Sequence, residues 1–143
     1  MILLTKNGMG IKINSTEVGA TSRTTIGVKG INIKDEDEIV SAIPLRNEAD
    51  QLAIFSSLGL AKKFKSDELP VQKKGGKGLI CYKPTATSGE VVSAVLVSDE
   101  DNLLVCGDKT SICISATEIP LLSRSSLGNQ VIKGNNLLSV SKV

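Results

Sequence analysis

Apolar and polar residues alternate over short stretches along the whole chain. The clearest examples are MGIKI at 9–13, GVKGINI at 27–33 and ICISA at 112–116. A period of two places successive side chains on opposite faces and is typical of half-buried β-strands. Asn-Gly, Gly-Asp and Ser-Gly pairs separate such stretches, as turns do. No stretch combines helical periodicity with caps, so the pattern predicts an all-β protein.

The strand pattern recurs three times, with a period of about 50 residues. The stretches 2–18, 53–69 and 103–119 align without gaps. Each contains an apolar strand, a polar turn with glycine and a second, alternating strand. Each then ends with a glutamate and an aliphatic residue, and these glutamates are Glu17, Glu68 and Glu118. Repetition of this kind predicts a chain built from similar structural units.

Each unit also closes on an apolar strand. The three closing strands are EIVSAIPL, EVVSAVLV and NLLSVSKV. We therefore predict one domain of three blade repeats with four antiparallel strands each, at residues 1–46, 50–97 and 102–143. Units of this size cannot bury their own faces, so we expect them to stack around a shared core.

Composition limits what that core and the protein can be. Hydrophobic residues make up 41% of the chain but aromatic residues only 2%, so the core must consist of Ile, Leu and Val. Few aromatic side chains also argue against single-strand binding by base stacking. No apolar run approaches the length of a membrane span, and the first eight residues are too short and too polar for a signal peptide. We expect a cytoplasmic protein.

Several kinds of chemistry lack the residues they need. The chain has no histidine, the commonest general base and metal ligand. Cys81, Cys106 and Cys113 form no C-x-x-C pair, and we expect three buried, reduced thiols. Tyr82 is expected to be a half-buried strand residue, and the acidic run 35–38 a solvated turn rather than a magnesium site. No nucleophile–base or metal constellation is visible, so we expect no catalytic activity from this chain itself.

Positive charge is concentrated in one segment. The net charge is +2, but residues 62–83 contain seven lysines and two carboxylates, a local charge of +5. The remainder of the chain carries a charge of −3. Localised positive charge of this kind indicates a polyanionic partner.

A glycine- and lysine-rich heptapeptide forms the centre of that segment. Its residues are Gln72, Lys73, Lys74, Gly75, Gly76, Lys77 and Gly78. Glycine permits positive φ and close backbone approach, and the N–H groups of such a turn can form an anion-binding nest. The lysines add positive charge and the glutamine a neutral donor, which suits phosphate and carries no base specificity. The alternative is a hairpin loop that uses glycine for its turn and lysine for solubility.

The repeat and the heptapeptide together resemble one known family. A unit of strand, glycine turn, strand, [Ser/Thr]-x-Glu, basic glycine loop and two further strands is similar to a blade of the C-terminal domain of bacterial type II topoisomerase A subunits, those of DNA gyrase and topoisomerase IV. QKKGGKG resembles the family's gyrase box, with Lys in place of Arg. The resemblance covers essentially all 143 residues. It implies a β-pinwheel, whose propeller-like, four-stranded blades exchange a strand with a neighbour.

The resemblance also implies a function. Duplex DNA would bind around the rim and bend, which directs it for ATP-dependent strand passage and supercoiling; a topoisomerase IV-like domain would bind DNA without full wrapping. The partners implied are the ATPase B subunit and the remainder of the A subunit, near the bacterial nucleoid. No cofactor is expected in this domain, because ATP and Mg²⁺ act elsewhere in such enzymes. A rival of another class is a propeller-like module whose basic loop docks an acidic protein.

Further candidate DNA contacts lie outside the heptapeptide. At the corresponding places in the other units these candidates are Arg23, Lys29 and Arg124, each either a phosphate contact or a solvated charge. In the second strand of the middle unit, alternation places Lys63 and Lys65 on one face and Lys62 on the other. We expect one of these faces to line the DNA groove, through Lys63 and Lys65, and the other to meet solvent.

Overall fold

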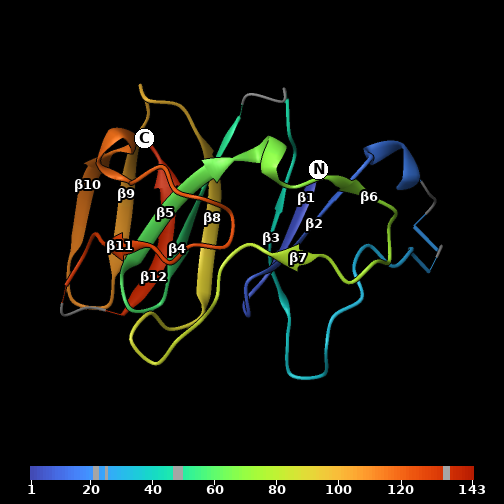
Figure 1. Cartoon of the computed structure of the whole chain (residues 1–143), viewed down its shortest axis with the longest axis horizontal. Helices are drawn as coiled ribbons and strands as arrows, with labels where there is room; N and C mark the ends of the chain where they lie inside the picture. Colours follow the sequence, from blue (N-terminus) through green and yellow to red (C-terminus); the bar gives the residue numbers. More distant parts are fainter. Residues whose placement is uncertain (21–22, 25, 47–49, 134–135) are drawn as a thin grey trace.

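The computed structural model is all-β and describes residues 1–20, 23–24, 26–46, 50–133 and 136–143. Its strands form three sheets that follow one another along the long axis of the molecule (Figure 1). The helices of the described residues are single 3-10 turns, η1 (Ser15–Glu17), η2 (Ser66–Glu68) and η3 (Ala116–Glu118). None of them is long and apolar enough to cross a membrane. The all-β prediction is confirmed.

Each sheet contains three antiparallel strands, and the first strand of the unit lies between the other two. In the first sheet these are β1 (Ile2–Thr5), β2 (Met9–Ile13) and β3 (Ile39–Ile43). In the second they are β4 (Gln51–Ser56), β5 (Leu60–Lys65) and β8 (Val91–Val97). In the third they are β9 (Asn102–Gly107), β10 (Ser111–Ser115) and β12 (Leu137–Lys142). The closing strands lie next to one another, because β8 contacts both β3 and β12.

The middle sheet is buried on both faces. Leu52, Ile54 and Phe64 pack toward the first sheet, in a cluster with Ile2 and Leu4. The alternate residues of the same strands, Ala53, Phe55 and Ala61, pack toward the third sheet, in a cluster with Leu103 and Val105. A strand covered on both sides needs apolar residues at every position, which is why β4 reads as a continuous apolar run. As expected, both clusters are mainly aliphatic.

Short strands from one unit complete the sheet of the unit before it. β6 (Val71–Gln72) runs parallel to the end of β2, and β7 (Leu79–Ile80) runs antiparallel to its beginning. In the third unit, β11 (Asn129–Gln130) pairs with β5 in the same antiparallel way. A parallel bridge between Lys63 and Leu121 corresponds to the β6 pairing. Successive units are therefore connected through backbone hydrogen bonds as well as apolar contacts.

The structure differs from the sequence-based expectation in residues 27–33. Their alternation predicts a strand, but only Ile31 forms a bridge, with Gly76. The corresponding segments of the later units become strands by pairing with the preceding sheet. In the described part of the chain no strand is placed to do this for 27–33, and alternation alone supplies no hydrogen-bonding partner.

Other side chains are placed only partly as expected. The prediction of three buried thiols is wrong, because Cys81 is buried, Cys106 half-buried and Cys113 exposed; all three are free. Tyr82 is fully buried rather than half-buried. The acidic run 35–38 lies in a turn whose side chains are mostly exposed, as predicted.

The turn glycines provide a test of the fold. At Gly59 the backbone φ is +89° and an added Cβ would lie 2.2 Å from the Ile132 carbonyl oxygen. Gly59→Ala should therefore lower the free energy of unfolding by about 1–3 kcal/mol, measured by urea denaturation. Gly19→Ala is the control, because an added Cβ there meets nothing within 4 Å. Equal stability of the two variants would contradict the close approach of the middle unit, at Gly59, to the third unit, at Ile132.

Candidate nucleic-acid interface

The basic heptapeptide forms a loop that projects from the edge of β2. β6 pairs with Lys12 and Ile13 at one end of that strand, and β7 pairs with Met9 and Gly10 at the other. The chain between them, 73–78, leaves the edge of β2, and within it Gly76 forms an isolated bridge with Ile31. It encloses a hollow lined by residues 72–78. The loop thus lies at the sheet edge, as a surface contact site requires.

Two of its glycines are necessary for this conformation. Gly75 has φ of +81° and donates its N–H to the Gly30 carbonyl oxygen at 2.7 Å. Gly78 has φ of +76°, and an added Cβ there would lie 2.5 Å from the Gly10 carbonyl oxygen. Side chains would be strained at both positions. The glycines therefore bring the loop against its neighbours and leave the lysines outside.

All three lysines of the loop are exposed. The Lys74 backbone N–H donates to Glu17 Oε2 at 3.3 Å, and its Nζ donates to the Glu17 carbonyl oxygen at 3.1 Å. Exposed Lys29 lies beside the loop, because a Cβ at Gly75 would contact its side chain at 3.9 Å. The first and middle units therefore bring four lysines to one place: Lys29, Lys73, Lys74 and Lys77.

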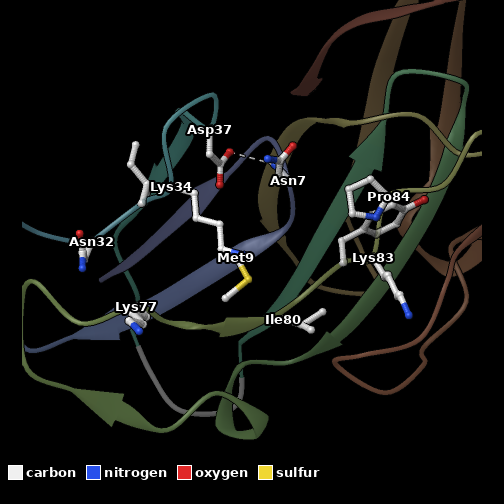
Figure 2. A pocket seen from close by; sticks show the side chains of 11 residues that line it. Asn7, Met9, Asn32, Lys34, Asp37, Lys77, Ile80, Lys83 and Pro84 are labelled. Carbon is white, nitrogen blue, oxygen red and sulfur yellow. Dashed lines mark hydrogen bonds between the residues drawn. The ribbon is translucent and has the colours of Figure 1, made fainter.

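A cavity of about 540 Å³ lies next to the loop (Figure 2). Met9, Ile80 and Pro84 contribute apolar wall, and Lys77 lies at its edge. Across the cavity, Asp37 accepts a hydrogen bond from the Asn7 backbone N–H at 3.1 Å. This carboxylate belongs to the acidic turn of the first unit, so that turn and Lys77 of the middle unit lie on opposite sides of the cavity.

A second loop occupies the same place one unit further on. Residues 122–128 bow outward from the edge of β5, as 72–78 do from β2. The Arg124 backbone N–H donates to Glu68 Oε1 at 3.1 Å, which repeats the contact between Lys74 and Glu17. The Arg124 guanidinium donates through Nη1 to the Ile80 carbonyl oxygen at 2.5 Å. Lys74 and Arg124 are therefore equivalent basic residues on successive sheet edges.

Lys62 lies beneath this second loop and is fully buried. Its Nζ donates to three carbonyl oxygens, those of Ser123 at 3.2 Å, Arg124 at 2.5 Å and Ser126 at 2.6 Å. It also lies over the rings of Phe64 and Tyr82, 5.5 and 5.7 Å from their centroids. Burial lowers the pKa of Lys62 to about 8; the nearby charge of Arg124 lowers it as well, while that of Glu68 raises it.

β5 carries Lys62 and Lys63, and neither side chain lies at the surface as expected. Lys63 is 5% exposed; its Nζ donates to the Ala116 carbonyl oxygen at 2.9 Å and pairs with Asp99 at 3.4 Å. The equivalent Lys12 donates to the Ser66 carbonyl oxygen at 3.0 Å, so each of these lysines binds the 3-10 turn of the following unit. Lys62 and Lys63 do lie on opposite faces, but both are buried between units, which leaves Lys63 out of the exposed basic surface.

Two remaining candidates lie at the surface. Lys65 is exposed at the end of β5, and Arg23 is exposed in a turn of the first unit.

Glu17, Glu68 and Lys62 were not among the contact residues predicted from the sequence. The sequence did contain a signal for their contacts with the loops. Residues 72–78 align with 122–128 at an offset of 50, and each loop follows an aligned glutamate. In the described part of the chain, no cluster of side chains is suited to hold a metal ion.

A family model described as "DNA gyrase C-terminal domain, beta-propeller" matches residues 1–46 and 50–99. The chain is 35% identical over 137 residues to the DNA gyrase A protein of Lawsonia intracellularis, and 33% identical over 137 residues to that of Deinococcus deserti. These alignments cover 93% and 92% of the chain but 17% of each relative. The chain therefore spans about a sixth of the relatives' length.

Solved structures with the same fold cover nearly the whole chain. The C-terminal domain of a DNA topoisomerase IV matches with a TM-score of 0.91 and 26% identity over 99% of this chain and 46% of that one. A DNA gyrase A C-terminal domain matches with a TM-score of 0.90 and 30% identity over 99% of this chain and 49% of that one. Each of these domains is about twice as long as this chain.

The lysine contacts between units can be tested by stability. Lys63→Met keeps the apolar stem but removes the hydrogen bond from the ammonium to Ala116, so it should lower the free energy of unfolding by about 1–2 kcal/mol. Lys65→Met, two residues along the same strand, removes an exposed charge and should change it by less than about 0.5 kcal/mol. Urea denaturation of both variants makes the comparison. Equal values would show that Lys63 does not connect the units.

Proposed function

Because this chain belongs to the DNA gyrase C-terminal domain family, we propose that it binds duplex DNA along the outer edges of its sheets, without sequence specificity. The observation that carries the proposal is the loop 72–78, which projects three exposed lysines from the edge of β2 and matches the gyrase box pattern. Phosphate contacts of this kind position DNA and release counterions.

The path of the DNA follows from the repetition of the loops. Lys74 and Arg124 occupy equivalent places on β2 and β5, each anchored through its backbone N–H to a glutamate. A duplex that contacts the first loop and then the second follows successive edges of the stack. Bending to follow those edges costs elastic energy, so base sequence matters through deformability. Lys29, beside the first loop, adds charge near this path, and the exposed Lys65 and Arg23 are further candidates for phosphate contact.

In the parent enzyme this binding would direct DNA for ATP-dependent strand passage. The ATPase B subunit and the remainder of the A subunit would supply cleavage, ATP and Mg²⁺ chemistry, and this chain would contribute no catalytic group. A gyrase-like role wraps DNA and introduces supercoils, while a topoisomerase IV-like role binds DNA without full wrapping. The structural similarity to domains of both kinds of enzyme supports both roles.

The dependence of binding on salt tests the loop directly. Each phosphate neutralised contributes about 0.9 to the slope of log affinity against log salt concentration. Replacing Lys73, Lys74 and Lys77 together by Gln should therefore reduce that slope by up to about 2.7 and weaken binding to a labelled duplex. Fluorescence anisotropy at several salt concentrations measures both quantities.

A charge-matched control is available in the third unit. Replacing Lys109, Lys133 and Lys142 by Gln removes the same charge away from the loop 72–78, and should change the slope much less. If the loop variant bound DNA with the slope of the unsubstituted protein, the loop would not be the DNA contact.

Wrapping is tested by DNA topology. Nicked circular DNA that is bound by the chain and then ligated should retain a change in linking number if the duplex curves around the stack. Gel separation of the topoisomers after protein removal measures the change. Binding that leaves linking number unaltered would favour the topoisomerase IV-like role.

A further inference from the structure

Lys62 differs from the other lysines because its charge is enclosed by backbone. The three carbonyl oxygens that surround its Nζ all come from one surface loop, at Ser123, Arg124 and Ser126. An ammonium group has three N–H donors, so donors and acceptors match in number. The loop is therefore shaped around a buried cation, and its carbonyl groups point inward instead of toward solvent.

The first unit shows how the same place is filled without a cation. Ile11 occupies there the position that Lys62 has in the middle unit, and a Cβ at Gly76 would lie 3.3 Å from its Cδ1. The loop above Ile11 has two successive glycines, Gly75 and Gly76, and Gly75 has positive φ. In the part of the second loop that covers Lys62, the corresponding residues are Ser125 and Ser126, and no described non-glycine residue has positive φ. Lys62 thus holds a loop that has serines where the first loop has Gly75 and Gly76.

We propose that Lys62 is a positioning residue for DNA binding: its ammonium holds the loop 123–126 so that Arg124 meets a backbone phosphate, and this contact weakens when Lys62 loses its proton. The inference rests on the proposed function and assigns to that site a pH-sensitive element. Arg124 uses one guanidinium N–H for Ile80, which leaves four of its five donors for a phosphate.

Deprotonation of Lys62 has two effects, and both weaken DNA binding. A neutral amine donates only two hydrogen bonds, so one of the three carbonyl oxygens loses its donor and the loop loosens. A positive charge beneath the loop also disappears, which weakens attraction for phosphate. Since the pKa of Lys62 is lowered to about 8, both effects fall between about pH 7 and 9.

The neighbouring thiol of Cys81 does not change charge in that range. Cys81 faces Lys62, and burial raises the pKa of its thiol to about 11, so it stays neutral. The exposed thiol of Cys113 lies on β10, away from the loop, and Cys113→Ser provides a control that lacks this thiol.

The experiment measures duplex affinity by anisotropy at pH 7 and pH 9 in 0.1 M salt. For the unsubstituted chain we expect up to about eightfold weaker binding at pH 9, the value of one phosphate contact at this salt concentration. Lys62→Met should bind at pH 7 as weakly as the unsubstituted chain does at pH 9 and show no change with pH. Arg124→Gln should lose the same affinity and most of the pH dependence, and the double variant should lose no more than either single one.

Lys63→Met is the matched control, because it also removes a buried ammonium from β5 but one that binds Ala116 and not the loop. It should keep the pH dependence. A flat pH profile of the unsubstituted chain, or additive losses in the double variant, would overturn the role of Lys62 while salt-dependent binding upholds the proposed function. Absence of any duplex binding at low salt would overturn the proposed function itself. If Lys62→Met fails to fold, the pH profiles of the unsubstituted chain and Arg124→Gln still decide.

Discussion

The pairing of β2 and β5 with strands of the following unit is the interaction on which the rest of the structure depends. A sheet edge presents unpaired N–H and C=O groups that must find a partner. Here the partner is supplied by the next unit, in two short pieces that run in opposite directions. Because the pieces attach at the two ends of one strand, the chain between them must leave the sheet. The exposed loop is a direct consequence of this connection.

The same connection explains why so many charged residues are buried or bonded to backbone. Glu17 and Glu68 each accept a backbone N–H of the following unit, and Lys12 and Lys63 each donate to one of its carbonyl groups. Polar groups at an interface between units need partners, since an unpaired buried group is costly. The polar contacts and the apolar clusters therefore fix the same relation between neighbours, and the repetition of both keeps the loops in equivalent places.

Charge in this protein consequently has two separate uses. Exposed lysines of the loop 72–78 are available to a polyanion, while Lys62 and Lys63 satisfy carbonyl groups inside the stack. All of them contribute to the same basic segment of the sequence. The net charge of that segment thus overstates the charge at the surface, and the glycines decide which part of it projects outward.

The sequence by itself determined the fold class, the main strands of each unit and the place of the basic loop. Period-two alternation, turn glycines and the closing strands are local signals, and Met9–Ile13, Ser111–Ser115 and Val91–Val97 all form strands as predicted. The repeat led to the family resemblance, which the comparisons confirmed. Only the tertiary structure decided which sheet each short strand joins, why 27–33 forms no strand, and that Lys62 and Lys63 are buried. Those outcomes depend on which segments lie opposite each other, and alternation specifies the faces of a strand but not what covers them.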